Sequence, residues 1–500
     1  MRATLRGMVG IMAASHGLHE HYNMTNAPAA RAAPTRKGPG SQVSILSSEL
    51  SRALRPRHVA MISIGGIIGA GLFVGSSAAI AATGPAIVLS YLLTGALILL
   101  VMRMLGEMAV ALPQVRSFTE FARAGLGPWA GFVAGWLYWY FWVIVVPFEA
   151  IAGAKLLHGW VVGVPEWELG LGLMAIMTGV NLLSARSYGE FEFWFSSIKV
   201  ASIMVFIVLA TAYTCGWTSV RGPGFNNLSS HGGFVPHGVA ALLSGAVTVF
   251  FQLTGAEITT VAAAESQEPA RAVAQMTTSV IFRILIFYVG SIFLIVCVVP
   301  WEQVRVGESP FTLALTTMGV SWASKAMSIV ILTAVLSCLN SAFYVCSRVL
   351  FVLAEHADAP QALIRLNARR VPARSVWIAS LAGVLGVVAQ TLAPETVFAF
   401  LLNASSALMV FVYIIITCAQ IRLRRQRERS GAAASALQMW LFPWASYGAI
   451  AGMLAVLAAM AFNPSQAQEL YVSLLTLAVT FLAYGVLRAR RAVQAKRSIA

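Results

Sequence analysis

Long apolar stretches alternate with short polar breaks from His58 almost to the end of the chain. A helix that crosses the hydrocarbon core of a bilayer needs about 20 mainly apolar residues. The pattern predicts spanning helices at residues 59–81, 86–108, 130–155, 168–188, 192–215, 238–262, 280–300, 326–353, 375–393, 396–420, 440–462 and 468–487. Because this makes twelve spans, both termini should lie on one side of the membrane.

Composition supports lipid as the main solvent of this chain. Hydrophobic residues make up 58% of the sequence and charged residues only 11%, whereas soluble domains are typically about 25% charged. We therefore expect an all-α integral membrane protein. Residues 1–57, rich in Ala, Ser, Pro and Arg, read as a disordered tail. Residues 58–490 form the expected membrane domain, and residues 491–500 a second short tail.

The net charge of +15 indicates topology rather than nucleic-acid binding. Most of the 34 Lys and Arg residues fall in the tails and in every second break, including Arg271 and Arg283 in the sixth. Cytoplasmic loops carry such an excess of basic residues. The opposite side would carry only Lys155, Arg221, Arg305 and Lys325. Both termini are thus predicted to be cytoplasmic, and we expect no nucleic-acid partner.

The five cysteines are scattered, mostly within apolar runs, and no CxxC or ligand-like spacing occurs. We expect free thiols that pack as small apolar groups. No metal, cofactor or disulfide framework is predicted.

Four glycines interrupt the first apolar stretch between Ile64 and Phe73, at Gly65, Gly66, Gly69 and Gly71. Small residues allow close helix packing, but glycine also permits an unwound segment. Unwound backbone at bilayer depth is tolerated only where it lines a cavity or binds a ligand. The N-terminus of the resumed half-helix would then receive a carboxylate. The glycines alone leave both interpretations open.

The sixth apolar stretch contains a second polar interruption, FFQLTGAE, which includes Phe251, Gly255 and Glu257. Glu265 follows eight positions after Glu257, close to the same helical face. The second interruption lies five helices after the first, so the two broken helices should cross in opposite directions. This indicates an inverted-topology repeat, in which the helices of residues 59–215 are mirrored by those of 238–420. The helices at about 440–487 would be additional.

Few other ionisable residues lie within the predicted spans. Inserting a charge at the centre of a spanning helix costs about 2.5–3.5 kcal/mol on insertion scales. Lys199 lies in the fifth span, where desolvation of its ammonium would favour proton exchange near neutral pH; the alternative is a permanently paired lysine that ties this helix to the first. Glu149 and Glu257 either handle substrate and protons or remain paired inside the bundle. Glu107, beside Arg103, is a candidate capping or gating group.

The segments RHVAMISIGGIIGAGLFVGSS, MRMLGEMAVA, GWLYWYFWVIVVPFEA, YGEFEFWFSSIKV, GAEITTVAAAES, SCLNSA and SRVL follow one another in this order. Together they resemble the amino acid–polyamine–organocation superfamily over about residues 46–490. Within it the chain is most similar to the bacterial amino acid permeases of the γ-aminobutyrate branch.

The resemblance implies a LeuT-like five-plus-five inverted repeat with broken helices 1 and 6, and proton-driven amino acid uptake across the inner membrane. It implies that Gly66, Gly69 and Gly71 receive the substrate carboxylate and that Phe251 and Gly255 face the amino group. Glu149 would partner an amino group held away from the carboxylate. The implied coupling group is Lys199, together with Glu257, and the implied pathway positions are Glu107, Glu265 and Cys338.

The sequence departs from the family pattern at Gln252 and Leu253, where relatives commonly have Ser and Phe, and at Asn403, where close relatives have an acid. Another substrate therefore stays open, whether an aromatic, basic or small neutral amino acid. An amino acid sensor that transports nothing is a second alternative. A membrane-embedded enzyme is a third, and we expect none because no HExxH motif, serine–histidine pairing or metal cluster occurs. Oligomeric state is left open.

Overall fold

The computed structural model describes residues 54–65, 68–113, 115, 117–183, 185–218, 220, 222–263, 280, 283–393, 397, 401 and 406–497, all within one unit, Ser47–Ala500. Over these ranges the chain forms helices and no β-strand, which confirms the predicted all-α class. Gly66, Glu265 and Asn403 lie outside the described residues.

The first half of the chain forms short helices around a few long ones. In chain order they are α3 (Pro56–Gly65), a π-helical turn (Gly71–Gly75), α4 (Ser76–Thr83), α5 (Ile87–Ala111), α6 (Phe118–Leu126), α7 (Pro128–His158), α8 (Glu166–Leu183), α9 (Ala185–Thr214), α10 (Ala240–Leu253) and α11 (Ile258–Ala263).

The second half begins with another π-helical turn, Arg283–Gly290, which continues directly into α13 (Ser291–Val298). The later helices are α14 (Pro310–Thr317), α15 (Ser321–Glu355), α16 (Ala373–Leu392), α18 (Ser406–Arg429), α19 (Trp444–Phe462) and α20 (Pro464–Arg497). Four of the sixteen labelled α-helices, α3, α7, α14 and α20, begin with a proline at the first helical position. Proline suits that position because its missing N–H would have no partner there.

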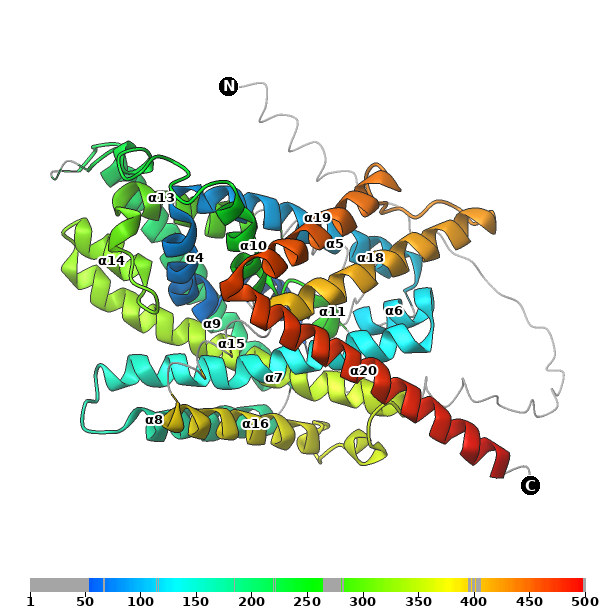
Figure 1. Ribbon diagram of the computed structural model, residues 1–500. Helices are drawn as coiled ribbons and strands as arrows, with labels where there is room; N and C mark the ends of the chain where they lie inside the picture. The colour runs from blue at the N-terminus through cyan, green and yellow to red at the C-terminus, as the bar shows by residue number, and fades with distance from the viewer. Residues whose placement is uncertain are drawn as a thin grey trace, which may run out of the picture. The chain divides into compact units, whose positions relative to one another are not determined.

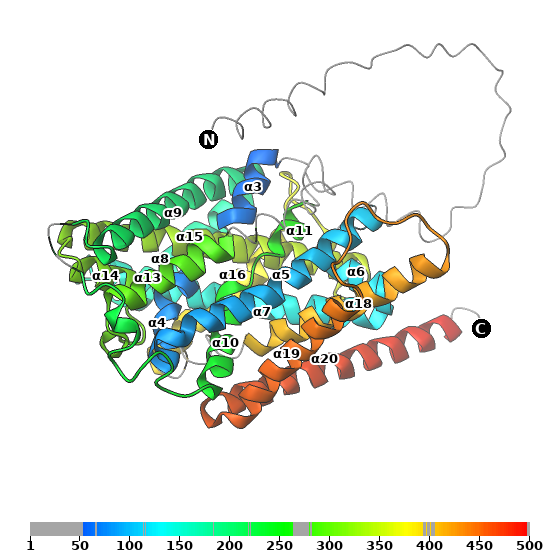
Figure 2. The ribbon, with the colours of Figure 1, turned by 90° about the horizontal axis from the view of Figure 1, so that it is seen from above.

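The helices divide into an inner and an outer set (Figures 1 and 2). The long helices α7 and α15 pack along each other and contact most of the remaining bundle. In the apolar stretch of α7, 78% of the residues are buried, compared with 17% in the stretch within α20. The outer helices instead expose large apolar side chains, as lipid-facing helices do. The core therefore lies around α7, α15 and the interrupted helices.

Nine helices of the described ranges are long and apolar enough to cross a membrane, and Arg283–Val298 is a shorter apolar helix. One of the nine, Gly71–Ala111, covers the end of the first predicted span and the whole of the second. It bends at Gly84, which has φ 70° and is followed by a short 3₁₀ turn, Gly84–Ala86. The chain is thus multiply membrane-spanning, while the number twelve stays a prediction.

Both interruptions fall where the sequence predicts them. Helix α3 ends at Gly65, and the helical path resumes with the turn at Gly71. Helix α10 ends at Leu253, Thr254 is extended, and α11 begins at Ile258. Gly255 has φ 116°, a backbone conformation that residues with a Cβ rarely adopt. The second interruption therefore depends on glycine.

Gly84 provides a test of this fold. A Cβ at this position would lie 2.5 Å from Cγ of Pro236, and φ 70° adds backbone strain. We expect Gly84→Ala to destabilise the protein by about 1–3 kcal/mol. Gly179→Ala is the matched control, because its Cβ would meet nothing within 4 Å and alanine favours a helix. Thermal unfolding of detergent-purified protein measures both; an equal midpoint for the two variants would contradict the assignment.

Candidate functional site

Lys199 of α9 binds backbone carbonyls at and just after the C-terminal end of α3. Its buried ammonium donates hydrogen bonds to the carbonyls of Gly65 and Ile68, the latter at 2.9 Å. Such carbonyls have no helical partner where a helix stops. Of the alternatives that the sequence left open, the tie between the fifth predicted span and the first is present in the structure. A role in proton exchange is compatible with it.

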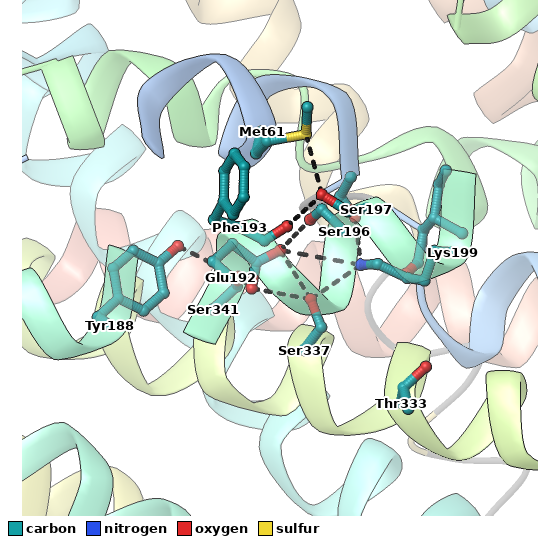
Figure 3. A network of polar contacts seen from close by, with 12 residues as sticks. Met61, Tyr188, Glu192, Phe193, Ser196, Ser197, Lys199, Thr333, Ser337 and Ser341 are labelled. Carbon is teal, nitrogen blue, oxygen red and sulfur yellow. Dashed lines mark hydrogen bonds and ion pairs between the residues drawn. The ribbon is translucent and has the colours of Figure 1, made fainter. Parts of the chain in front are cut away.

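A polar network surrounds this lysine (Figure 3). The ammonium also donates to Ser337 Oγ of α15 at 2.8 Å and lies 3.8 Å from Glu192 Oε1. Glu192 in turn accepts from Ser196, Ser337 and Ser341 at 2.7–3.3 Å. Residues 192, 196 and 199 are spaced to share one face of α9. Three helices thus meet at one buried ion pair.

Glu149 of α7 lies at the other side of the first interruption. Both of its carboxylate oxygens are 3.3 Å from the N–H of Ala70, which precedes the π-helical turn. A negative group is favoured at this end of a helix, because the free N–H groups and the helix dipole point toward it. The family resemblance implies that a substrate carboxylate binds at this end of the helix. In this structure the carboxylate of Glu149 lies there instead.

Close approach explains the small residues of the first interruption. A Cβ at Gly69 would lie 2.7 Å from both Cys338 Cβ and Glu149 Oε1. At Gly65 a Cβ would lie 2.1 Å from Ser196 Oγ. Side chains at these positions would push the first helix away from α7, α9 and α15. Cys338 and Glu149, both predicted from sequence, therefore meet at Gly69.

The second interruption packs against the first through Gly71. A Cβ there would meet Gln252 Cα at 3.4 Å and the Phe251 ring at 3.7 Å. The Phe251 ring packs edge-on against Phe148 of α7, with 5.4 Å between centroids. Gln252 accepts a hydrogen bond from the Tyr91 hydroxyl, while its buried Nε2 has no partner in the described part of the chain. The departure at Gln252 thus places an unpaired amide beside Gly71.

The Glu257 side chain binds back to the backbone of the second interruption. Its Oε2 accepts from the N–H of Gly255 at 3.1 Å and from the Tyr413 hydroxyl of α18 at 2.8 Å. The side chain is fully buried, and its Oε1 has no hydrogen-bond partner among the described residues. The hydroxyl of Tyr138 lies within electrostatic range of this carboxylate and has no hydrogen-bond partner among the described residues. Glu257 is therefore only half satisfied.

Glu107 lies apart from these residues, on a cavity of about 560 Å³. Its partners are Arg424 at 3.2 Å, Gln420 at 2.7 Å and the N–H of Met439 at 3.1 Å. Arg103, the neighbour expected from sequence, instead donates to the carbonyl of Gln438. Glu107 thus ties α5 to α18 and to the segment before α19.

The structure brings most of the predicted positions together. Gly69, Gly71, Glu149, Cys338, Phe251 and Gly255 line the two interruptions, with Lys199 behind the first and Glu257 within the second. Glu192, Ser337 and Tyr413 were not predicted from the sequence, although Glu192 precedes Lys199 by two helical turns. The prediction that Arg283 lies in a polar break is wrong, because this residue is 1% exposed and begins a helical turn.

Comparison with known proteins identifies the relatives of this chain. Residues 58–497 match the family model described as amino acid permease. The γ-aminobutyric acid permease of Bacillus subtilis (strain 168) is 42% identical over 89% of this chain and 95% of its own.

Two other relatives extend the comparison. A probable GABA permease of Pseudomonas aeruginosa (strain PAO1) is 44% identical over 89% of this chain and 94% of its own. The aromatic amino acid transport protein AroP of Escherichia coli (strain K12) is 38% identical over 72% of this chain and 79% of its own. These relatives are transporters, which confirms the expectation that the chain is not an enzyme. The chain is a multi-pass membrane protein that belongs to the amino acid permease family.

Proposed function

We propose that this permease imports an amino acid, most favourably γ-aminobutyrate, across the bacterial inner membrane together with protons. The observation that carries the proposal is the interrupted first helix, whose free carbonyls face Lys199 and whose free N–H faces Glu149. Backbone opened at this depth can hold a zwitterion through its own dipoles. The two similar GABA permeases support γ-aminobutyrate as the substrate.

A cavity beside the first interruption supports this function. It has a volume of about 620 Å³ and is lined by Val74 of the π-helical turn and by Ile151 and Ala152, two and three residues after Glu149 on α7. Lys155, Glu166 and Glu308 also line it, so the entrance carries charges of both signs. A zwitterion can be guided through such an entrance by either of its ends.

In this mechanism a substrate carboxylate replaces Glu149 at the N–H of Ala70 and at Gly69 and Gly71, and Gly66, outside the described residues, is proposed from the resemblance as a further contact. The amino group of γ-aminobutyrate, held three carbons away from its carboxylate, meets the released Glu149 or the interruption at Phe251 and Gly255. Lys199 and Glu257 carry the coupled proton. Cys338, Glu107 and Glu265 lie along the pathway.

The proposed architecture is twelve spans with both termini in the cytoplasm, five plus five of them related as inverted repeats. Alternating access follows if the two interrupted helices move against the rest of the bundle. Proton-motive force supplies the free energy, because one charge that crosses the membrane potential is worth about 2.3 kcal/mol per 100 mV. The lipid bilayer is the required partner, and no cofactor takes part.

Uptake by purified protein in liposomes tests the function directly. We expect labelled γ-aminobutyrate to accumulate when the lumen is alkaline relative to the outside, and accumulation to stop when a protonophore collapses the gradient. A competition panel of aromatic, basic and small neutral amino acids identifies any better substrate. Binding without accumulation would indicate a sensor, and dependence on sodium instead of protons would contradict the coupling.

The Lys199 network gives a second test. Lys199→Ala should abolish gradient-driven accumulation, since the carbonyls of Gly65 and Ile68 lose the ammonium donor and Glu192 loses its cationic partner. Loss of one member of a buried pair costs about 3–5 kcal/mol in stability, so thermal unfolding is measured in parallel and folded protein is selected. Lys325→Ala, at an exposed lysine of α15, is the control. Unaltered proton coupling in folded Lys199→Ala protein would refute the assigned role.

Substitution of Glu149 gives the third test of the proposed function. Glu149→Gln keeps the shape but removes the charge proposed to meet a distant amino group. Hydrogen bonds to charged groups contribute about 1.5–3 kcal/mol, so KM for γ-aminobutyrate should rise about tenfold or more. The KM for an α-amino acid found in the panel should change less. Glu168→Gln, at an exposed acid of α8, serves as the control. Equal changes for both substrates would argue against the amino-group contact.

A further inference from the structure

Arg283 is a buried cation that has no hydrogen-bonding partner among the described residues. It begins the π-helical turn Arg283–Gly290 and is 1% exposed. Its Nε, Nη1 and Nη2 atoms all lack a hydrogen-bond partner in the described part of the chain. A guanidinium at membrane depth is expensive and is normally paired with an acid or with carbonyls. Its unpaired state here requires an explanation.

Packing places this turn against the second interruption. The Tyr288 hydroxyl, from the same turn, donates to the carbonyl of Gln252 at 3.1 Å. On the other side, a Cβ at Gly95 of α5 would lie 2.5 Å from Ile284. The turn is thus wedged between α5 and the end of α10. Short π-helical stretches recur at functional sites.

Glu257 is the acid within electrostatic range of Arg283, together with the hydroxyls of Tyr288 and Tyr413. Tyr413 hydrogen-bonds Glu257 directly at 2.8 Å. Arg283 and Glu257 therefore belong to one buried cluster, although no ion pair joins them in this conformation within the described residues.

The other buried acids of the described ranges are already engaged. Both carboxylate oxygens are occupied in Glu107, Glu149, Glu192 and Asp358. Only Glu257 among the buried acids keeps an oxygen, Oε1, without a hydrogen bond. The cation and the acid therefore lie within electrostatic range of each other, and each lacks a hydrogen-bonded partner of opposite charge among the described residues.

We propose that Arg283 is a positioning residue that forms an ion pair with Glu257 in a second conformation of the carrier, linking α11 to the π-helical turn when the bundle rearranges. In the present conformation Glu257 is held by Gly255 and Tyr413 instead. A side chain with two sets of partners supplies the two-state element that a conformational cycle requires. The proposal rests on the proposed transport function and names a residue that sets its rate.

Transport kinetics test the pair. Arg283→Gln should lower the maximal rate of γ-aminobutyrate uptake about tenfold or more, whereas KM should change less than threefold, as expected for a contact made in only one state. Arg283→Lys should recover part of the rate because it restores the charge. In substrate counterflow, which needs no proton gradient, the double variant Arg283→Gln/Glu257→Gln should be no slower than the slower single variant. The proposal would be overturned if the fold-loss of rate in the double variant equalled the product of the two single losses. Wild-type kinetics in the Arg283→Gln protein would also overturn it.

A buried arginine with partners provides the control for folding. Arg348 is 4% exposed, donates to Ser347 Oγ and stacks on the Tyr344 ring. Arg348→Gln should lower the thermal midpoint, with a loss of rate that simply multiplies with that of Glu257→Gln. Coupling of Glu257 to Arg348 as strong as to Arg283 would mean that any buried arginine gives the effect, and would overturn the pairing.

Proximity is measured without transport. In a background with the five cysteines replaced by alanine, Glu257→Cys/Arg283→Cys protein is treated with a bifunctional thiol reagent that spans the two lost side chains. We expect a cross-link whose yield rises with γ-aminobutyrate, and none in either single variant. If no cross-link forms while wild-type uptake is intact, the pairing is refuted and the transport function stands. If the cross-link forms but wild-type protein transports nothing, the transport function falls and the pairing remains.

Discussion

The contact between a lysine ammonium and two open carbonyls is the interaction on which the rest of the site depends. A helix that stops in the middle of a bilayer leaves backbone groups that neither water nor lipid can satisfy. Lys199 donates to the carbonyls of Gly65 and Ile68 and to Ser337, and Glu192, itself held by Ser196, Ser337 and Ser341, lies 3.8 Å from the ammonium. The interruption exists because α9 and α15 supply these groups. Without them, an unbroken helix would be the more stable path for the chain.

The two ends of the interruption contact side chains of opposite type, a cation at one end and an acid at the other. Carbonyls at the end of α3 face a cation, and the N–H at the start of the resumed helix faces the carboxylate of Glu149. This arrangement follows the direction of the helix dipole, which is negative at a C-terminus and positive at an N-terminus. Side chains of α7 and α9 therefore hold the site open from both sides, while the first helix supplies mainly backbone.

Much of this site could be predicted because charges are rare in membrane spans. Glycine runs and isolated acids stand out against apolar sequence, so Glu149, Lys199 and Glu257 could be found without a structure. Glu192 was missed because it sits near the polar start of its helix, where an acid is unremarkable. Arg283 was assigned to a loop for the same reason. Burial at a helix end depends on which neighbours cover it, and the sequence pattern carries no such information.

Helix boundaries show a similar limit. Hydropathy alone divides residues 59–108 into two spans, whereas the structure has an interruption after Gly65 and then a nearly continuous helical path that bends at Gly84. The span predicted at 280–300 is a π-helical turn joined to the short helix α13. Both differences come from packing. Gly95 and Gly245 let neighbouring helices approach closely, which shifts where each helix can bend or end.

The bond between Glu149 and the N–H of Ala70 has a consequence for selectivity. Because that donor already has an anion, an incoming carboxylate exchanges one bond for a similar one and gains little from this contact alone. Inorganic anions, which offer nothing else, would have no advantage over the resident side chain. Discrimination must then come from the remainder of the guest molecule, above all from how far its cationic end reaches once the resident anion has been displaced.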